Sequence, residues 1–330
     1  MTTNMKFFLL SAISVAVLSG CGSDSAPQQK TAKVSFSITD APVDTAVEVN
    51  VTYKSLIFLR NGQEDIIVPL VNDEGEATTQ QINLLDYQNG NSLLILNEVE
   101  LLIGQYDNLI IETEGCAQNP NGSTDYCNVV DANGTYPLKT PSNKLKLGSF
   151  TVSVEATQAY TIDFNLRKSL VSTANGQSFN LKPHGITIVE SKGVGSVSGK
   201  VDVNLLTAGN CPIDGNVVYL YQGNYTNELG QVLEGFVLGD EFDPAVDKSV
   251  PENVVAPYAS KMVESADAGY SYSFNFLPQG DYTLAFSCSA IDDNPETYDK
   301  IVIADPIDQV KHFTLTEGEN LESDFFENVD

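Results

Sequence analysis

The sequence predicts an all-β protein in which two antiparallel β-sandwich domains follow one another, and three observations support this fold class. Apolar and polar residues alternate with a period of two along much of the chain, as in half-buried strands. Asn-Gly dipeptides, which favour tight hairpin turns, separate several of these runs. The two halves also differ in charge, since residues 22–192 carry 11 basic and 20 acidic side chains whereas residues 193–330 carry 5 and 24. A length of 330 residues fits two domains.

Residues 1–20 are predicted to be a lipoprotein signal peptide. Lys6 precedes an uncharged stretch over residues 7–18 that is too short for a membrane span of about 20 residues. The sequence Leu18-Ser19-Gly20-Cys21 resembles the bacterial lipobox, which implies that Cys21 is acylated and that residues 21–32 form a flexible tether. Gly22 after the cysteine implies delivery to the outer membrane, with a periplasmic or surface-facing orientation left open. The alternative is an ordinary secretory peptide with an incidental cysteine.

Residues 33–192 form the first predicted domain. Alternating runs typical of strands cover residues 34–39, 47–51, 150–154 and 160–166. The turn dipeptides are Asn61-Gly62, Asn89-Gly90, Asn133-Gly134 and Asn175-Gly176. Residues 84–97 lack clear alternation, so a short helix is expected there.

Residues 193–330 form the second predicted domain, which is the more acidic one. Strand patterns cover residues 197–203 and 217–221. The long acidic stretch between Gln222 and Ser265 has weak periodicity and is expected to be a loop excursion. The clearest hairpin places Tyr270, Tyr272, Phe274 and Phe276 on one face, turns at residues 277–281 and returns with Tyr282, Leu284, Phe286 and Cys288.

Both halves contain a glycine followed two residues later by a tyrosine. Gly104-Gln105-Tyr106 precedes the apolar run 109–111, and Gly280-Asp281-Tyr282 precedes the run 284–286. A tyrosine whose hydroxyl bonds the backbone near a bend resembles the tyrosine corner of Greek-key sandwiches. The repeated pattern favours two sandwiches over one sandwich joined to an unrelated α+β unit.

Four cysteines remain once Cys21 is assigned to lipid, and three pairings are possible. Pairing within each half is favoured in an oxidising compartment. A Cys116–Cys127 bond would close a turn-rich loop and contribute about 3 kcal/mol, and a Cys211–Cys288 bond about 4.5 kcal/mol. A zinc site is the alternative, but Cys-x-x-Cys is absent and neither histidine is near a cysteine pair in sequence.

A formal net charge of −27 excludes several partners. Nucleic acid and anionic lipid surfaces require clustered Lys and Arg side chains, and the sequence has no such cluster. The expected partners are the membrane, through the lipid anchor, and an envelope protein or a glycan.

No catalytic residue is assigned. The Gly-x-Ser-x-Gly, His-Glu-x-x-His, Gly-x-x-x-x-Gly-Lys and Gly-x-Gly-x-x-Gly motifs are absent. His184 and His312 are isolated and are expected to be structural or solvent-facing. A carboxylate pair could serve a glycosidase, for which Asp40 and Asp163 are eligible, so a carbohydrate-active hydrolase is the alternative to a non-enzymatic protein.

Two acidic, turn-rich segments, residues 240–247 and 292–299, are candidate cation sites. The second offers Asp292, Asp293, Glu296 and Asp299, whose oxygens suit calcium, although the EF-hand spacing is absent. The competing interpretation is a solvated acidic surface that keeps the protein soluble. We therefore expect no cofactor, with calcium at this loop as the candidate exception.

Several motifs resemble known families. Residues 34–42, 104–106, 161–164 and 181–183 resemble, over residues 34–189, the bacterial lipoprotein family of domain of unknown function 4382. Residues 195–201 and the 277–282 turn resemble carboxypeptidase-regulatory-like (prealbumin-like) β-sandwich modules. Neither resemblance carries catalytic information. Together they imply an envelope lipoprotein that serves as a binding or structural accessory module at the outer membrane.

Overall fold

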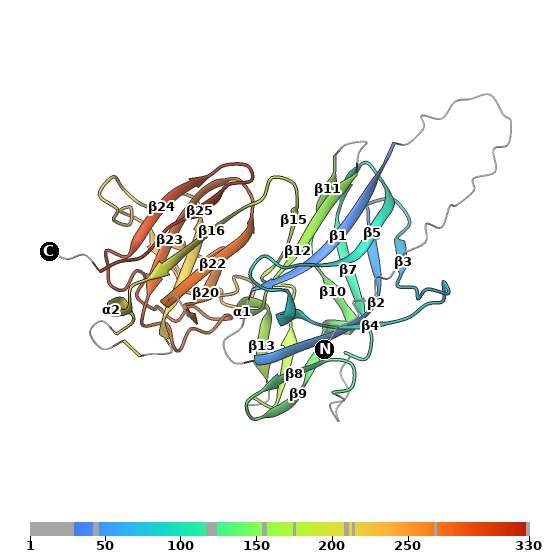
Figure 1. Ribbon diagram of the computed structural model, residues 1–330, viewed down its shortest axis with the longest axis horizontal. Helices are drawn as coiled ribbons and strands as arrows, with labels where there is room; N and C mark the ends of the chain where they lie inside the picture. Colours follow the sequence, from blue (N-terminus) through green and yellow to red (C-terminus); the bar gives the residue numbers. More distant parts are fainter. Residues whose placement is uncertain are drawn as a thin grey trace.

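The computed structural model describes residues 30–41, 46–116, 124–153, 157–173, 176–207, 211–212, 215–266 and 269–327. The predicted signal peptide, Cys21 and most of the tether lie outside these residues. Within them the chain forms two β-domains side by side, with the single-turn helix α1 (Leu166–Ser169) at their junction (Figure 1). In this part of the chain no helix has the length and apolar character needed to cross a membrane.

The first domain contains two large sheets. One has the order β15–β12–β1–β5, formed by β1 (Thr31–Ala41), β5 (Leu93–Leu102), β12 (Gln158–Asn165) and β15 (Ile186–Glu190). The other has the order β10–β7–β2–β8–β9–β14–β13, with β3 and β4 also paired to β2. Its strands are β2 (Ala46–Leu59), β3 (Ile66–Pro69), β4 (Gln80–Asn83), β7 (Asn108–Thr113), β8 (Asn128–Asp131), β9 (Gly134–Lys139), β10 (Lys144–Lys146), β13 (Leu170–Thr173) and β14 (Ser178–Leu181).

Short elements connect these strands. β6 (Gly104–Tyr106) pairs with β11 (Phe150–Val152), and two 3-10 helices span Leu84–Tyr87 and Pro141–Asn143. The first of these lies in the stretch where a short helix is expected, and the side chain of Asn83 caps it by accepting from the Leu85 N–H. Residues 88–92 form a turn, and residues 93–97 belong to β5.

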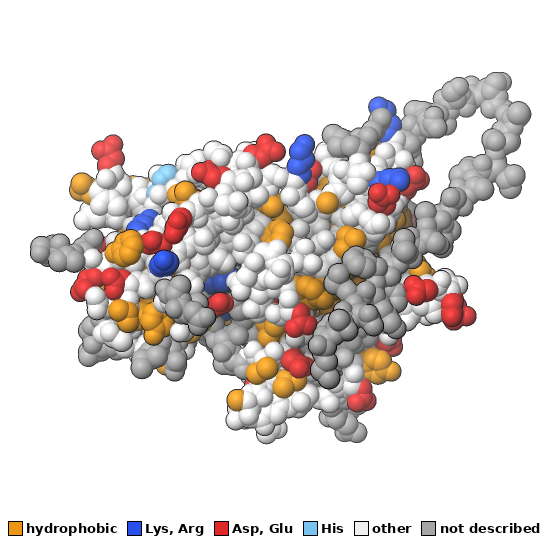
Figure 2. All heavy atoms as spheres, viewed as in Figure 1, with side chains coloured by type: hydrophobic (Ala, Val, Ile, Leu, Met, Phe, Trp, Pro, Cys, Tyr) orange, Lys and Arg blue, Asp and Glu red, His pale blue; other side chains and the backbone are white. Residues whose placement is uncertain are grey.

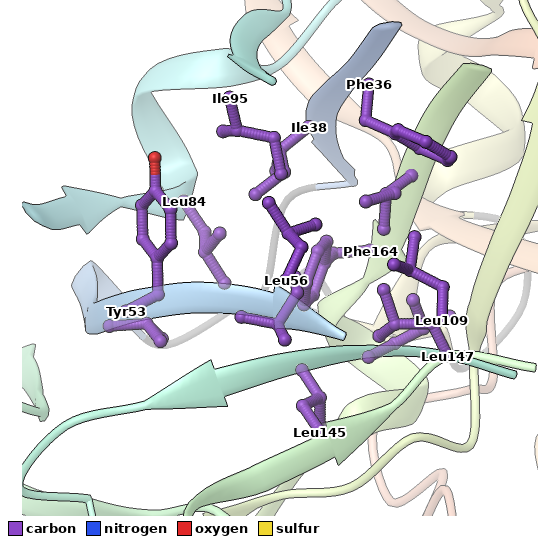
Figure 3. Close-up of a cluster of buried hydrophobic side chains, with 14 of the residues drawn as sticks. Phe36, Ile38, Tyr53, Leu56, Leu84, Ile95, Leu109, Leu145, Leu147 and Phe164 are labelled. Carbon is purple, nitrogen blue, oxygen red and sulfur yellow. The ribbon is translucent and has the colours of Figure 1, made fainter. Parts of the chain in front are cut away.

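The core of the first domain lies between its two large sheets. Phe36, Ile38 and Phe164 from one sheet lie opposite Leu56 and Leu109 from the other (Figure 3). The alternating residues of β1 and β12 are almost completely buried, as their period of two predicts. Burying each large apolar side chain stabilises the fold by about 1.5–3 kcal/mol, so the two patterned strands contribute much of the core.

The second domain is a sandwich of two four-stranded sheets. One has the order β21–β22–β16–β25, formed by β16 (Gly195–Val201), β21 (Glu264–Ala266), β22 (Gly269–Leu277) and β25 (Asn320–Glu322). The other has the order β20–β17–β23–β24, formed by β17 (Val217–Gln222), β20 (Ala259–Met262), β23 (Gly280–Ser287) and β24 (Val310–Leu315). β18 (Val237–Leu238) pairs with β19 (Val254–Val255), and a second helical turn, α2, spans Val203–Leu206. Among the described residues, every strand pair joins elements of one half, and the two halves meet between β15 and β16.

The structure corrects the predicted hairpin of the second domain. β22 and β23 belong to different sheets, so the chain crosses the sandwich between them instead of turning back within one sheet. Phe276 has a φ of +56°, and there the buried face changes, so that Leu277 is buried in place of Phe276. Tyr272 and Phe274 therefore face Tyr282, Leu284 and Phe286 across the core.

Smaller corrections concern strand ends and pairing. The strand predicted over residues 197–203 ends at Val201, because Asp202 caps α2 and leaves Val203 exposed. Asn89-Gly90 lies between a 3-10 helix and β5, so it is not a hairpin turn. Asn133-Gly134 does form the turn of the β8–β9 hairpin. Asn175 lies outside the described residues. The sheets are mostly antiparallel, but β1–β12, β9–β14, β16–β25 and β18–β19 are parallel pairs.

Both predicted tyrosine corners are present. The Tyr106 hydroxyl donates to the Leu102 carbonyl at 3.1 Å, and the Tyr282 hydroxyl donates to the Pro278 carbonyl at 2.8 Å. Each tyrosine is fully buried and lies where the chain passes from one sheet to the opposite one. In each case the hydroxyl gives a donor to the carbonyl four residues earlier, at or just after the end of the preceding strand.

The acidic stretch after β17 is packed and is not a free excursion. Residues 223–258 and 289–304, here called the cover, lie on the outer face of the β20–β17–β23–β24 sheet. Val217, Tyr219 and Tyr221 point to that face and are completely buried beneath it, while Val218 and Leu220 point into the sandwich. This explains why β17 is apolar at five successive positions.

Both favoured cysteine pairs are bonded in the structure. Cys116–Cys127 and Cys211–Cys288 each have a Cα–Cα distance of 5.3 Å. Each bond lies within one domain.

Candidate functional site

The junction of the two domains gathers charged side chains that are buried, and we call it the joint. On the first domain its framework is α1 together with residues 182–185. Asn165 caps α1 by accepting from the Lys168 N–H, and its own N–H donates to the Gly185 carbonyl at 2.9 Å. Gly185 has a φ of +84°, and a Cβ there would lie 2.4 Å from the Lys168 Cβ. The glycine thus lets the loop pack directly against the helix.

Arg167 makes the first buried ion pair of the joint. Its Nη2 lies 3.0 Å from the Asp293 Oδ2, and the two side chains are 7% and 1% exposed. The same carboxylate accepts from the Tyr219 hydroxyl at 2.7 Å and from the Glu241 N–H at 3.2 Å. Burial raises the pKa of Tyr219 well above its ordinary value, and the nearby Asp293 charge adds to that effect. Tyr219 is therefore a hydrogen-bond donor at any physiological pH.

Lys168 makes the second pair and is coordinated entirely by the other domain. Its Nζ lies 3.3 Å from the Glu241 Oε2, donates to the Tyr258 carbonyl at 3.1 Å and also donates to the Pro257 carbonyl. These three acceptors match the three N–H groups of an ammonium. Burial raises the pKa of Glu241, and the Lys168 charge acts against that rise.

Two further pairs lie nearer to solvent. Lys182 pairs with Glu296, and both side chains are about one-quarter exposed. The Nδ1 of His184 lies 3.7 Å from the Asp243 Oδ1. Burial lowers the pKa of His184 despite the neighbouring carboxylate, which favours the neutral imidazole near neutral pH.

A small recess opens between the domains beside these pairs. It is lined by Asp40 and Asp163 from the first domain and by Tyr258, Lys261, Phe274 and Leu277 from the second, among others. Burial raises the pKa of Asp163 to about 6, with Lys261 opposing the rise, and burial lowers the pKa of Lys261. The two carboxylates named as eligible for catalysis are thus in one recess, together with a buried ammonium.

The structure gives the predicted calcium ligands different partners. Asp293 pairs with Arg167, Glu296 pairs with Lys182, and Asp299 accepts from the Asn294 N–H within its own loop. Among the described residues, the one group of three candidate ligand atoms within 4.8 Å of one another is Cys211, Cys288 and Asp305, and both of those sulfurs are in a disulfide. No three of the four predicted carboxylates therefore converge.

The expectation of a solvated acidic surface is wrong for residues 240–243. Asp240 and Glu241 are completely buried, and Asp243 is 8% exposed. Asp240 accepts from the Asp299 and Ile301 N–H groups at 3.2 and 2.7 Å, which joins the two parts of the cover. These carboxylates serve as hydrogen-bond acceptors and ion-pair partners inside the protein, which a composition argument does not reveal.

The cationic half of the joint was not predicted. Arg167 and Lys168 are adjacent in sequence and follow the β12 pattern, where two cations would ordinarily indicate the end of a strand at the surface. The one feature of the sequence that could have indicated their role is that two adjacent basic residues are unusual in a chain with so few of them. On the face shown in Figure 2, acidic side chains are spread over both domains and basic ones form no patch.

Residues 31–183 match the model of a family described as Domain of unknown function (DUF4382). The resemblance predicted for the first domain is therefore confirmed. The matched region includes Arg167, Lys168 and Lys182. No curated protein matches the sequence significantly. The carboxypeptidase-regulatory-like assignment of the second domain stays a prediction, although the domain is a β-sandwich.

Several solved structures are similar to this chain at low identity. The Bacillus anthracis TIE protein is 13% identical, with a TM-score of 0.19, over 89% of this chain and 33% of that one, so this chain spans about a third of its length. A Bacteroides eggerthii protein, provisionally named a cell adhesion protein, is 10% identical with a TM-score of 0.21, over 89% and 98% of the two chains. The major pilin protein (T3.2) of Streptococcus pyogenes is 11% identical with a TM-score of 0.16, over 90% and 99%. With TM-scores this low, these likenesses carry no argument about function.

Proposed function

We propose that this protein is a non-enzymatic lipoprotein of the bacterial envelope, anchored at the outer membrane through Cys21, whose two docked domains act as a binding or structural accessory module. The observation that carries the proposal is the use of buried charge at the joint. Asp293 and Glu241 hold Arg167 and Lys168 between the domains, so these acidic groups are engaged in fixing the arrangement of the domains. A module of this kind holds the second domain in place for a binding partner and does not require a catalysed reaction.

The direction of β1 supports presentation of the second domain away from the anchor. β1 begins at Thr31, close after the predicted tether, and runs toward the joint, where Asp40 lines the recess (Figure 1). At about 3.3 Å per residue, the start of β1 is about 30 Å from the joint. The acidic second domain, at a net charge of −19, would also be repelled by an anionic membrane surface.

Replacing Cys21 with alanine tests the anchor. We expect the wild-type protein to fractionate with detergent-soluble outer membranes and the Cys21→Ala variant to be released to the periplasm or the medium. Protease digestion of intact cells then reports whether the second domain faces the outside. Membrane retention of the variant would contradict the lipid anchor.

A carbohydrate-active hydrolase is the second candidate, and the recess favours it to a limited extent. Asp163, with its pKa raised to about 6, could act as a general acid beside Asp40. Lys261 and the apolar residues Phe274 and Leu277 occupy the same recess, however, and leave little room for a sugar ring. Hydrolysis of aryl glycosides or envelope glycans by the wild type, with loss in Asp163→Asn, would replace the non-enzymatic proposal.

A further inference from the structure

The cover lies on an aromatic sheet face that it conceals. Tyr219 and Tyr221 of β17 are completely buried beneath it, and Leu238, Ala290 and Ala304 pack there. The Tyr221 hydroxyl donates to the Gly239 carbonyl at 2.7 Å, which ties the cover to the face. Without the cover, this side of the second domain would present tyrosine rings to solvent.

The cover has little regular secondary structure of its own. Its one named strand pair, β18 with β19, is two residues long on each side, and apart from a single bridge between Thr226 and Val232 the remaining described backbone is irregular or forms turns and bends. Its two parts are joined mostly by side chains, because Asp240 accepts from the Asp299 and Ile301 N–H groups and Asp247 accepts from the Tyr298 N–H at 3.2 Å, beside one backbone bond from the Asp243 N–H to the Glu296 carbonyl. Segments held mainly by such contacts open at lower free energy than the strands of a sandwich.

The buried carboxylates of the cover take their cations from the first domain. In the part of the chain that the structure describes, the ion pairs of Asp293 and Glu241 are with Arg167 and Lys168. Both carboxylate side chains are 1% exposed. A buried carboxylate that loses its cation must be protonated or hydrated, so separation of the domains would favour movement of the cover into solvent.

We propose that the cover is a strap that the first domain locks onto the second, and that it lifts as a unit when the joint opens, exposing the Tyr219 and Tyr221 face. The lock consists of the two buried pairs. When the joint opens, the cover loses the free energy of its buried apolar contacts, and its acidic groups become hydrated. The device links the arrangement of the domains to the exposure of one specific apolar surface, and it does not depend on the proposed lipid anchor.

Hydrogen exchange measured by mass spectrometry on the full chain tests the strap. The variant is Arg167→Met/Lys168→Met, which removes both cations while keeping apolar stems. We expect exchange of residues 236–258 and 289–304 to rise at least tenfold more than exchange of β16, β23 and the first-domain strand β2, which follows the global stability. Lys182→Met, which breaks the more exposed pair, is the matched control and is expected to leave the cover protected.

The wild type provides an independent measurement if the double variant folds poorly. In urea well below the unfolding midpoint, the cover is expected to exchange through an opening that leaves β17 and β23 hydrogen-bonded. Exchange of the cover only together with those strands would show that it is no separate strap and would overturn the proposal. Unchanged cover protection in a folded Arg167→Met/Lys168→Met protein would equally overturn it.

Discussion

The ammonium group of Lys168 in the first domain lies 3.3 Å from the carboxylate of Glu241 in the second, and both side chains are nearly inaccessible to solvent. Each group alone would carry a large desolvation cost at this position. The pairing is favourable only when the domains are docked, since neither domain supplies both charges. Together with the Arg167–Asp293 pair, this relationship fixes the relative position of the two domains.

Replacing Lys168 with methionine is expected to lower the free energy of unfolding by about 3–5 kcal/mol, because it leaves the Glu241 carboxylate buried without a cation. The partly exposed pair offers a matched control, since Lys182→Met is expected to cost no more than about 1 kcal/mol. Urea unfolding of the full chain measures both. Equal effects of the two substitutions would contradict a special role for the buried pair.

A double-mutant cycle separates the pair from its surroundings. Combining Lys168→Met with Glu241→Leu removes both charges, and the double variant is expected to be more stable than Lys168→Met alone. The coupling free energy is expected to exceed about 1 kcal/mol. Recovery is expected to be incomplete, because the Pro257 and Tyr258 carbonyls lose their donor. Additive effects would show that the two charges do not interact in the folded protein.

The contribution of Asp163 to stability is expected to become more favourable as the pH falls from about 7.5 to about 5. Asp163 has a folded-state pKa of about 6 against an ordinary value of 3.8, so the folded protein binds this proton more tightly than the unfolded chain. The ionised carboxylate opposes folding above the raised pKa, and that opposition declines as the pH falls through about 6 and is lost only below the ordinary value of 3.8. The full difference corresponds to about 3 kcal/mol as an upper value.

The variant Asp163→Asn supplies the comparison for this pH dependence. Its unfolding free energy is expected to vary less between pH 5 and pH 7.5 than that of the wild type. Asp240, whose pKa burial likewise raises to about 6, retains its share of the dependence in this variant. Identical pH profiles for the wild type and Asp163→Asn would place the titration of Asp163 outside this range.

The sequence predicts those parts of the fold that follow from local periodicity. Phe36, Ile38 and Phe164 occupy the buried face that alternation indicates, and the tyrosine corners are where the Gly-x-Tyr pattern places them. Sheet membership was not predictable in the same way, because a strand followed by a turn and a second strand can stay in one sheet or change sheets. The β22–β23 connection is the example.

The joint was hidden from sequence reasoning for a different reason. Asp293 and Glu241 look like surface acids in the sequence, because isolated charges avoid the interior. Their burial is explained only by their partners, which are far away in the chain: Lys168 and Glu241 are 73 positions apart. The role of Arg167 is hidden in the same way, because Asp293 lies 126 positions further along the chain. Charge complementarity between the two domains arises only when both are folded and docked, so local sequence patterns do not show it.

Calcium is expected not to raise the melting temperature of the full chain beyond a sodium control of equal ionic strength. Asp293 and Glu296 already pair with Arg167 and Lys182, which leaves Asp292 and Asp299 as the remaining predicted ligands. Two carboxylates fall short of the six to eight oxygens that calcium takes. Thermal unfolding in millimolar calcium measures this. A calcium-specific rise that disappears in Asp292→Asn would restore the loop as a cation site.

The two tyrosine corners are expected to be of comparable energetic importance. Replacing Tyr282 with phenylalanine keeps the ring, which stacks on Phe313 with centroids 5.5 Å apart, and removes only the hydroxyl that bonds the Pro278 carbonyl. Loss of one hydrogen bond to a carbonyl at a buried corner costs about 1–2 kcal/mol. Tyr106→Phe removes the corresponding bond to Leu102 and is expected to cost a similar amount.

Urea unfolding of both variants, followed by a probe in each domain, tests this expectation. Tyr126→Phe is the matched control, because Tyr126 is 46% exposed and its substitution is expected to change stability by no more than about 0.5 kcal/mol. If Tyr106→Phe and Tyr282→Phe both behave like the control, the hydroxyl bonds do not stabilise the corners. Losses of about 3–5 kcal/mol would instead indicate that the rings repack, since that is the cost of deleting a buried aromatic side chain.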